Sequence, residues 1–494
     1  MDEYINAIRQ KNAGLCRSAC VVTFGCQQNE ADSEKLRGMA AAMGYTITDE
    51  PAKADLIVVN TCAIREHAEQ KALSTIGQFK HLKAKNADLI IGVCGCMTAQ
   101  KRRVDELKNS YPYVDFTFEP STLDRFPEYL CEVMDSRRRC FHIGEAAGSI
   151  SEGVPILRSG NAKAWVSIMY GCNNFCSYCI VPYVRDRERS REYQYVIDEV
   201  KEVVAAGAKD VTLLGQNVNS FAGGCTFAEL IEKLSEVEGD FRLRFMTSHP
   251  KDVSDELIAA MAKSKNAARH FHLPLQSGSD EILHAMNRHY DRAHYLSIVE
   301  KLRAAMPDIA LTTDIIVGFP GETDADFEAT LDILRRVRFD MIYSFIYSPR
   351  SGTPAAKMEN QIPEEVKSAR MQNCSPCRTK SRLKSIRRLS ASRFAFSSTE
   401  KVKTTRTPMR VGAKQASSFI LSPKPTFRVN LRLFASPAQS RSACTANYRK
   451  NKFIHKEENH HDDRRNQKKS RGARQAAEGK RRGQGCRGCQ GSLR

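Results

Sequence analysis

The sequence predicts an α/β protein in which a doubly wound parallel sheet is followed by a full or partial parallel barrel and then by a disordered tail. Three observations predict this architecture. Short apolar runs alternate with amphipathic segments over residues 16–131, the alternation resumes in residues 158–371, and no periodicity is visible in residues 372–494. Strand–helix alternation favours parallel sheets, and a chain of 494 residues has room for about three such units.

The first domain, residues 16–131, is expected to contain three buried strands rich in Val, Ile or Leu. They are Ala19–Phe24, Asp55–Asn60 and Asp88–Val93. Helices are expected over Asp32–Met43 and Ile64–Leu82, because apolar residues recur there at spacings of three and four. Helices between parallel strands cover both faces of a sheet, so the domain is predicted to be doubly wound.

The second domain, residues 158–371, shows six strand–helix units after a connector over residues 132–157. Such a series predicts a barrel whose chemistry lies on the loops at the carboxyl ends of the strands. The expected strands are Trp165–Met169, Val211–Leu214, Arg242–Thr247, His270–Leu275, Ala310–Val317 and Asp340–Ile346. The expected helices include Tyr195–Ala205, Phe227–Val237, Ser254–Lys263 and Asp326–Val337.

The net charge of +19 is unevenly distributed along the chain. Residues 372–494 contain 31 Lys and Arg against 6 Asp and Glu, which leaves 45 basic and 51 acidic residues in residues 1–371. The two predicted domains are therefore mildly acidic. The high overall charge does not by itself indicate a nucleic-acid-binding fold.

Several classes of protein are not expected from this sequence. Its first residues, Met-Asp-Glu-Tyr, show no basic region ahead of an apolar core, so no secretory signal is expected. No run of about 18 apolar residues predicts a membrane span. Seventeen cysteines without an export signal favour metal or redox chemistry over disulfides, and we expect a cytoplasmic protein that does not contact the membrane.

The sharpest motif is a CxxxCxxC loop directly after the first barrel strand, with cysteines at Cys172, Cys176 and Cys179. Three thiolates in one loop can bind a [4Fe–4S] cluster, because iron–sulfur clusters need soft ligands, and they leave one iron open to a substrate. The alternative is a zinc knuckle, which needs a fourth Cys or His, and none lies within this loop. The motif therefore predicts an iron–sulfur cluster.

A second set of cysteines follows the three strands of the first domain. Cys26, Cys62 and Cys96 are 36 and 34 residues apart, which is about one strand–helix unit each. Ligands bind at the carboxyl ends of the strands in open parallel sheets, so three such loops can converge on a second three-thiolate cluster with an open iron. For each position alone the alternative is a buried core cysteine, which is what we expect of Cys94.

The CxxxCxxC loop at the mouth of a parallel barrel resembles the radical S-adenosylmethionine (SAM) superfamily. The resemblance implies a (βα)6-type partial barrel. It also implies that Cys172, Cys176 and Cys179 are the ligands of a catalytic [4Fe–4S] cluster. In that superfamily the open iron binds the methionine part of SAM, and one electron from the cluster cleaves SAM to give an organic radical.

The two cysteine sets in this order resemble the methylthiotransferase family, in which a domain with an auxiliary [4Fe–4S] cluster precedes the radical SAM domain. The match covers residues 16–371. It implies two [4Fe–4S] clusters, with Cys26, Cys62 and Cys96 as ligands of the auxiliary cluster, and it implies SAM as cosubstrate. Further family-like segments are Leu214–Ser220, Thr247–Pro250 and Asp314–Glu322.

Polar residues of these segments are candidates for binding SAM. Gln216, Asn217, Ser248 and His249 each follow a predicted barrel strand, and the resemblance implies that they line the SAM and substrate cavity. The alternative for each residue is ordinary loop polarity or helix capping.

Arginines that follow the CxxxCxxC loop are further candidates. The resemblance suggests Arg185 and Arg191 as contacts of SAM or RNA, although exposed arginines are usually solvated. The family usually has Gly where this chain has Asp186, and this departure leaves the conformation of the loop open.

Three segments resemble the branch of the family that modifies isopentenylated adenosine in tRNA: His272–Ser279, Met286–Arg288 and Tyr347–Pro354. The resemblance implies that a C–H bond at C2 of N6-isopentenyladenosine, next to the anticodon, becomes C–S–CH3. That hydrogen has no useful acidity, so a base cannot remove it at neutral pH and a radical route is needed. The expected substrate is tRNA, and the expected partner is an electron donor such as flavodoxin or ferredoxin.

Two other functions stay open from the sequence. The same chemistry could act on threonylcarbamoyl-adenosine in tRNA or on a ribosomal protein. The chain could also be a metal- or RNA-binding protein whose catalysis is impaired by its C-terminal region.

Residues 372–494 are dense in Arg, Lys and Ser, and this composition predicts disorder. Members of the family usually end in a small β-barrel RNA-binding module, the TRAM domain, and our hypothesis is that a frameshift close to Met371 has replaced it. Gene sequencing tests this hypothesis, because a shifted frame must encode a β-rich module. The alternatives are a basic arm that binds tRNA phosphates with salt-dependent affinity, and a zinc site formed by Cys374, Cys377, Cys486 and Cys489.

Overall fold

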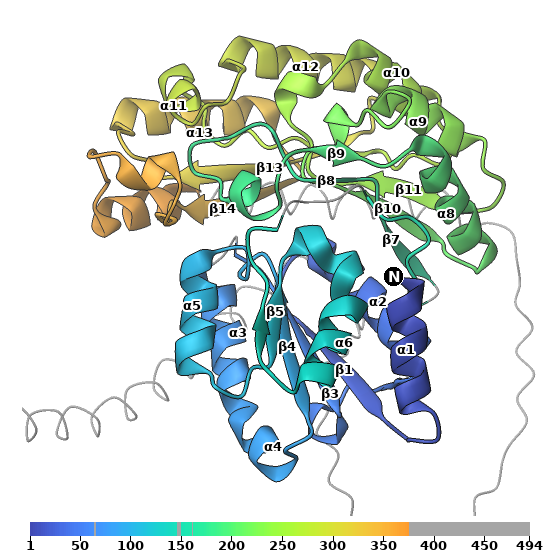
Figure 1. The fold of residues 1–494 in the computed structure, drawn as a ribbon. Coiled ribbons are helices and arrows are strands. Elements are labelled where there is room, and N and C mark those ends of the chain that lie inside the picture. Colours follow the sequence, from blue (N-terminus) through green and yellow to red (C-terminus); the bar gives the residue numbers. More distant parts are fainter. Residues whose placement is uncertain (64–65, 146–149, 161, 375–494) are drawn as a thin grey trace, which may run out of the picture. The chain divides into compact units, whose positions relative to one another are not determined.

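The structure, a computed structural model, describes residues 1–63, 66–145, 150–160 and 162–374 (Figure 1). Two parallel-sheet domains follow one another along this part of the chain, and the predicted α/β class is confirmed. Disorder was predicted from residue 372, but residues 372–374 continue a helix and Cys374 packs into an apolar core, so the prediction is wrong for these three residues. From Ser375 onward, the predictions made for the tail lie outside the described residues. Among the helices of the described ranges, none is both long and apolar enough to cross a lipid bilayer.

The N-terminal sheet has six parallel strands in the order β2-β1-β3-β4-β5-β6. They are β1 (Ser18–Thr23), β2 (Thr46–Ile47), β3 (Leu56–Thr61), β4 (Ile90–Gly95), β5 (Phe116–Phe118) and β6 (Cys140–Phe141). Every residue of β3 is buried, as expected of a central strand that is covered on both faces.

Helices cover both faces of this sheet, so it is doubly wound as predicted (Figure 1). Val58 of β3 packs into a core with α1 (Asp2–Asn12), α2 (Gln27–Ala42) and α6 (Phe126–Ser136). Its neighbours Ile57 and Val59 face the opposite layer, because successive side chains of a strand alternate between the two faces. That layer contains α3 (Glu66–Gln78), α4 (Lys80–Lys85) and α5 (Lys101–Ser110).

The second domain contains six parallel strands in two ladders, β7-β10-β11 and β12-β13-β14. They are β7 (Lys163–Ser167), β10 (Asp210–Leu214), β11 (Arg242–Phe245), β12 (His270–His272), β13 (Ala310–Val317) and β14 (Met341–Ile346). Leu243 of β11 pairs in parallel with Ala267, just before β12, and this bridge joins the two ladders. No pairing joins β7 to β14 within the described chain, so the predicted (βα)6 barrel is partial.

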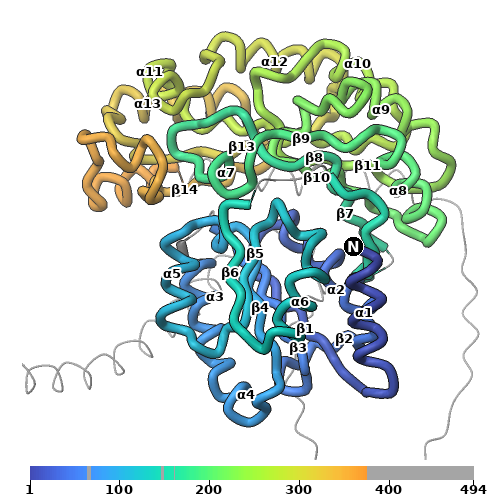
Figure 2. Tube along the Cα trace, in the orientation of Figure 1, coloured from blue at the N-terminus to red at the C-terminus, as the bar shows by residue number. Residues whose placement is uncertain are grey.

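The barrel helices lie along the outer side of these strands, and Figure 2 traces the chain through each strand–helix unit. They are α8 (Tyr193–Ala205), α9 (Phe227–Ser235), α10 (Asp255–Lys263), α12 (Arg292–Ala305) and α13 (Asp324–Val337), with the short α11 (Asp280–Ala285). One continuous apolar core fills the space between the strands and the five longer helices. Residues 364–374 are helical, and Cys374 is buried in this same core.

Candidate functional site

The structure places the three N-terminal cysteines at one edge of the first sheet. Cys26, Cys62 and Cys96 follow β1, β3 and β4, which are neighbours in the sheet and run in the same direction. Cys26 and Cys96 are close enough to interact electrostatically. Cys94 lies in the apolar core with α1, α2 and α6, as expected. The predicted cysteine set is therefore brought together at the carboxyl ends of the strands.

Two buried asparagines hold these cysteine loops in place. The Nδ2 of Asn29 donates to Asn60 Oδ1 at 2.9 Å and to the Thr61 carbonyl oxygen at 3.1 Å, and Asn60 Nδ2 donates to the Asn29 carbonyl oxygen at 2.9 Å. Gly95 has φ +96°, and a Cβ atom there would lie 2.3 Å from the Thr61 carbonyl oxygen. Only glycine fits directly before Cys96.

The barrel cysteines lie on the loop between β8 (Met169–Tyr170) and α7 (Val181–Val184). Cys176 interacts electrostatically with both Cys172 and Cys179, so the loop gathers all three. The turn that starts the loop depends on Gly171, which has φ +74° and whose Cβ would lie 2.1 Å from the carbonyl oxygen of Arg187.

Two residues of the Met286–Arg288 segment hold this loop. Asn287 Nδ2 donates to the carbonyl oxygens of Asn174 at 3.2 Å and Phe175 at 3.0 Å. Arg288 Nη1 donates to Cys176 Sγ at 3.3 Å, and the guanidinium is buried. The sequence marked this segment only as family-like, and the structure shows that it supports the cysteine loop.

The donor atoms of both cysteine sets fit an iron–sulfur cluster. In the described ranges, no three Cys, His, Asp or Glu side chains lie close enough to hold a single metal ion. The cysteines of a cluster bind different irons and can stand farther apart. Burial raises the pKa of the Cys179 thiol to about 12 and also raises the pKa values of the Cys96 and Cys172 thiols, so a bound cation is needed to form the thiolates.

Four of the predicted SAM contacts lie on two adjacent loops of the barrel. Gln216 and Asn217 follow β10, whereas Ser248 and His249 follow β11. Asn217 Nδ2 donates to Asp252 Oδ2 at 2.7 Å and so ties the two loops together. Gln216 Oε1, Asn217 Oδ1 and His249 Nε2 are buried and find no hydrogen-bond partner among the described residues. Such atoms are uncommon in folded proteins and are expected where a ligand binds.

His249 is a neutral hydrogen-bond donor on these loops. Burial, with the nearby positive charge of Arg288, holds the pKa of His249 well below its ordinary value. Its Nδ1 accepts from the backbone N–H of Lys251 at 3.3 Å, so the proton of the neutral ring is on Nε2. The ring packs edge-on against Tyr290, whose ring also contacts Arg288. His249 is thereby connected to the guanidinium that donates to Cys176.

Arg185 does not join these four residues. Its Nε donates to Cys96 Sγ at 3.1 Å and its Nη2 donates to Asp32 Oδ2 at 2.9 Å, both in the N-terminal domain. Arg185 is buried, so the alternative interpretation, that it is an exposed and solvated arginine, is wrong. Its contact with SAM stays a prediction that this geometry does not favour. The next residue, Asp186, has φ +62°, the left-handed conformation that favours the glycine usual in the family.

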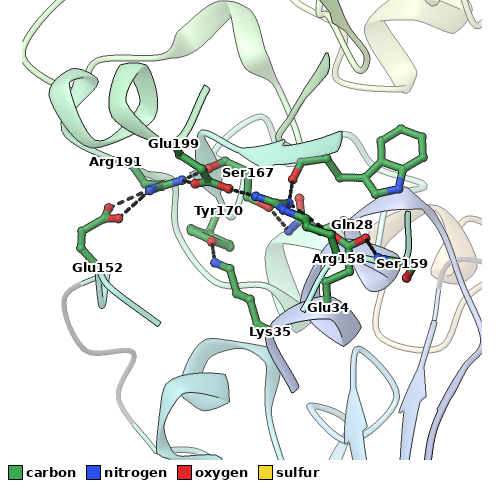
Figure 3. A network of polar contacts seen from close by, with 11 residues as sticks. Gln28, Glu34, Lys35, Glu152, Arg158, Ser159, Ser167, Tyr170, Arg191 and Glu199 are labelled. Atoms are coloured by element: carbon green, nitrogen blue, oxygen red, sulfur yellow. Dashed lines mark hydrogen bonds and ion pairs between the residues drawn. The ribbon is translucent and has the colours of Figure 1, made fainter. Parts of the chain in front are cut away.

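Arg191 belongs to a network of polar contacts between α2 and the barrel (Figure 3). Its guanidinium donates to Glu152, to Glu199 and to the Ser167 carbonyl oxygen, and it is buried rather than solvated. The other contacts of the network are Arg158 with Glu34 and Glu199, Lys35 with Tyr170, and Gln28 with Ser167. These contacts occupy Arg191 within the protein, and its contact with SAM or RNA stays a prediction.

A partial (βα)6 barrel with three cysteines on the loop after its first strand defines a radical SAM enzyme. The model of the Radical SAM superfamily matches residues 166–334, and that of Uncharacterized protein family UPF0004 matches residues 18–119. Two structures of the radical SAM methyltransferase TsrM from Kitasatospora setae share the fold. One, with tryptophan and a SAM analogue bound, has a TM-score of 0.52 at 15% identity over 69% of this chain and 75% of that chain. The other, with cobalamin and a [4Fe–4S] cluster bound, has a TM-score of 0.51 at 14% identity over 69% and 74%.

Curated relatives are much more similar in sequence. The tRNA-2-methylthio-N(6)-dimethylallyladenosine synthase of Acetivibrio thermocellus is 51% identical over 372 residues, which cover 74% of this chain and 78% of the relative. The synthase of the same name from Caldicellulosiruptor saccharolyticus is 50% identical over 380 residues, covering 75% and 81%. The chain belongs to the tRNA-2-methylthio-N(6)-dimethylallyladenosine synthase family of radical SAM methylthiotransferases.

Proposed function

We propose that the protein inserts sulfur and a methyl group at C2 of N6-isopentenyladenosine next to the anticodon of tRNA, using SAM and two [4Fe–4S] clusters. The observation that carries this proposal is the direct packing of one cysteine site on the other. Cys96 of the N-terminal set shares one apolar cluster with Ile180, which directly follows Cys179 of the barrel set, and with Val184, the last residue of α7. Two adjacent sites suit a reaction in which a radical formed at one site and sulfur supplied at the other must act on the same carbon atom.

Each cysteine set is assigned one cluster in this proposal. Cys172, Cys176 and Cys179 hold the cluster that binds SAM, whereas Cys26, Cys62 and Cys96 hold the auxiliary cluster. When bound, these groups supply the radical that cleavage of the C2–H bond requires and the sulfur that replaces the hydrogen. The protein contributes thiolate ligands and buried guanidinium donors, and the cysteines themselves are buried except Cys26, which is exposed, and Cys179, which is half-buried.

The buried polar atoms at the carboxyl ends of β10 and β11 support a role in binding SAM. Gln216 Oε1 and Asn217 Oδ1 are acceptors suited to the amino or hydroxyl groups of SAM, and His249 Nε2 is a donor suited to a carboxylate or an adenine nitrogen. Because the pKa of His249 is far below its usual range, this donor does not change with pH near neutrality. Ser248 Oγ donates to the His272 carbonyl oxygen at 2.8 Å and positions this loop on β12.

The side of β14 that faces away from the apolar core supports the proposed binding of an RNA base. Met341, Tyr343 and Phe345 are partly exposed on one side of the strand, whereas Ile342 packs into the core on the other. Tyr343 also contacts the ring of His272. An unstacked base of RNA stacks on aromatic side chains of this kind, and a base must leave its stack before its C2 atom can be reached.

The proposal also includes an electron donor and a cellular location. A radical reaction that begins with one-electron reduction needs a low-potential donor, and a flavodoxin or ferredoxin has the required chemistry. We place the reaction in the cytoplasm, where tRNA is modified.

The test is mass spectrometry of tRNA nucleosides from a strain that lacks this gene and is then complemented. Complementation should convert N6-isopentenyladenosine to its 2-methylthio form, and the Cys172→Ala variant should leave the unmodified nucleoside. If the 2-methylthio group appears only on threonylcarbamoyl-adenosine, or only on a ribosomal protein, the substrate is wrong. If neither tRNA nor protein gains a methylthio group, the proposed reaction is wrong.

A further inference from the structure

Arg185 connects the cysteine loop of the barrel to a cysteine of the N-terminal domain. It directly follows α7, and only 5% of its surface is exposed. Its Nε lies 3.1 Å from Cys96 Sγ, and its Nη2 lies 2.9 Å from Asp32 Oδ2. Asp32 is itself held by Gln28, whose Nε2 donates to Asp32 Oδ1 at 3.1 Å. The guanidinium is therefore fixed in direction by a carboxylate on one side and directed at a sulfur on the other.

The surroundings make this N–H···S contact stronger than a contact in water. Cys96 is packed among Ala63, Ile180 and Val184, which are all buried and apolar. In such surroundings, charges and dipoles interact more strongly than at the surface. Burying a guanidinium is costly unless the interior uses its charge and its donors. The ion pair with Asp32 accounts for one side of the guanidinium, and Cys96 is the partner on the other side.

We infer that Arg185 is a positioning residue of the auxiliary cluster, holding the Cys96 thiolate by a charge-assisted hydrogen bond and raising the reduction potential of that cluster. The inference rests on the proposed function, in which Cys96 is a ligand of iron. Hydrogen bonds to cluster sulfurs and fixed nearby charges are among the factors that set these potentials. A positive charge favours the reduced cluster, which carries one more electron, and the negative charge of Asp32 has the opposite effect.

Arg185 belongs to the barrel domain, yet it contributes to the surroundings of a cluster that the N-terminal domain would bind. Arg185 is six residues from Cys179 in the chain, and α7 joins the two. The barrel set has a separate guanidinium, that of Arg288 on Cys176. Each cysteine set therefore has one buried arginine of its own, and Arg185 can be changed without removing the donor to Cys176.

The test measures the auxiliary cluster alone. In the full chain, Cys172→Ala, Cys176→Ala and Cys179→Ala are combined so that only the N-terminal set can bind a cluster. Iron and sulfide are added anaerobically, and the midpoint potential is measured by redox titration followed by electron paramagnetic resonance. The Arg185→Met change should shift the equilibrium toward the oxidised cluster about tenfold, which is a decrease of about 59 mV for one electron. Arg185→Lys should restore part of the potential, because an ammonium group keeps the charge and can donate.

Two further variants separate this role from general packing. Asp32→Asn should shift the potential in the opposite direction, whereas a purely structural defect would move both variants the same way. Arg158→Met, which removes another arginine between α2 and the barrel that contacts Glu34 and Glu199 rather than a cysteine, should leave the potential unchanged.

The outcomes distinguish a failure of the inference from a failure of the proposed function on which it rests. An Arg185→Met protein with full iron content and an unchanged potential would overturn the inference and leave the proposed function intact. Equal shifts in the Arg185→Met and Arg158→Met proteins would also overturn it. If the background protein binds no iron at the N-terminal set, the two-cluster function fails and the inference fails with it.

Discussion

Arg370 donates from Nη1 to two oxygen atoms of Glu322, the backbone carbonyl at 3.0 Å and the carboxylate Oε2 at 2.8 Å. The same carboxylate oxygen accepts the backbone N–H of Gly318 at 2.8 Å. The side chains of Arg370 and Glu322 are 8% and 2% exposed. Glu322 lies on the loop after β13 and Arg370 lies in helical residues 364–374, so this buried pair fixes the last described helix to the barrel.

Arg370→Met should lower the free energy of unfolding by about 3 kcal/mol, because it leaves the Glu322 carboxylate buried without its counter-charge. Urea unfolding followed by circular dichroism measures this change. Adding Glu322→Gln removes the unpaired charge, so the double variant should be less destabilised than the sum of the two single variants. Strictly additive effects would contradict the coupling.

The half-buried imidazole of His270, at the start of β12, predicts a loss of stability in acid. Burial, with the nearby His272 and Arg244, lowers the pKa of His270 to about 4 from an ordinary value of 6.5. As the pH falls from 6.5 toward 4, the unfolded chain binds a proton that the folded chain does not. Stability therefore decreases by up to about 1.4 kcal/mol per pH unit. The free energy of unfolding, measured between pH 6 and 4.5, should depend less steeply on pH in His270→Gln, and an unchanged slope would count against this assignment.

Asp186 predicts a stabilising substitution beside the cysteine loop. Its φ of +62° is unfavourable for a residue with a side chain, although Asp tolerates it better than most. Asp186→Gly should raise stability by about 0.5–1 kcal/mol, since the greater freedom of Gly in the unfolded chain offsets part of the relieved strain. Thermal melting compares this variant with Asp186→Ala, which should be less stable than the parent protein. The reverse order would show that this conformation is not under strain.

The central strands were the most predictable part of the fold. The expected ranges Asp55–Asn60 and Asp88–Val93 differ from β3 and β4 by one and two residues, because a strand covered on both faces is a continuous apolar run. The edge strand β6 and its neighbour β5 were not predicted, since segments of two and three residues are too short to show a period. The expected helix Ile64–Leu82 is divided into α3 and α4, with the break at Phe79, which is buried.

The candidate site was predictable where its residues repeat along the chain. The cysteines could be found because each follows a strand at a regular distance. The contacts of Arg185 could not be found, because Cys96 and Arg185 are 89 residues apart and only the packing of α7 brings them together. The same holds for Asn287, whose two partners precede it by more than a hundred residues. A sequence shows which residues can donate, but the acceptor depends on the tertiary structure.

Asn287 should control how firmly the barrel cysteines hold iron. It combines a φ of +56° with hydrogen bonds to the carbonyl oxygens of Asn174 and Phe175, and Phe175 is itself strained at φ +47°. Asn287→Ala loses both hydrogen bonds and the side chain that tolerates this φ, so it should lower stability by about 2 kcal/mol and reduce the iron retained. Asn287→Gly keeps the backbone conformation and lacks only the amide.

Iron per chain should be measured in a protein that carries Cys26→Ala, Cys62→Ala and Cys96→Ala, so that only the barrel set can bind a cluster. If the amide holds the loop, Asn287→Gly and Asn287→Ala should both lose iron faster than the parent when a chelator is added. If the backbone conformation is what matters, Asn287→Gly should keep its iron as the parent does. That second result would contradict the role assigned to the two hydrogen bonds, because glycine removes them while it relieves the strain at this position.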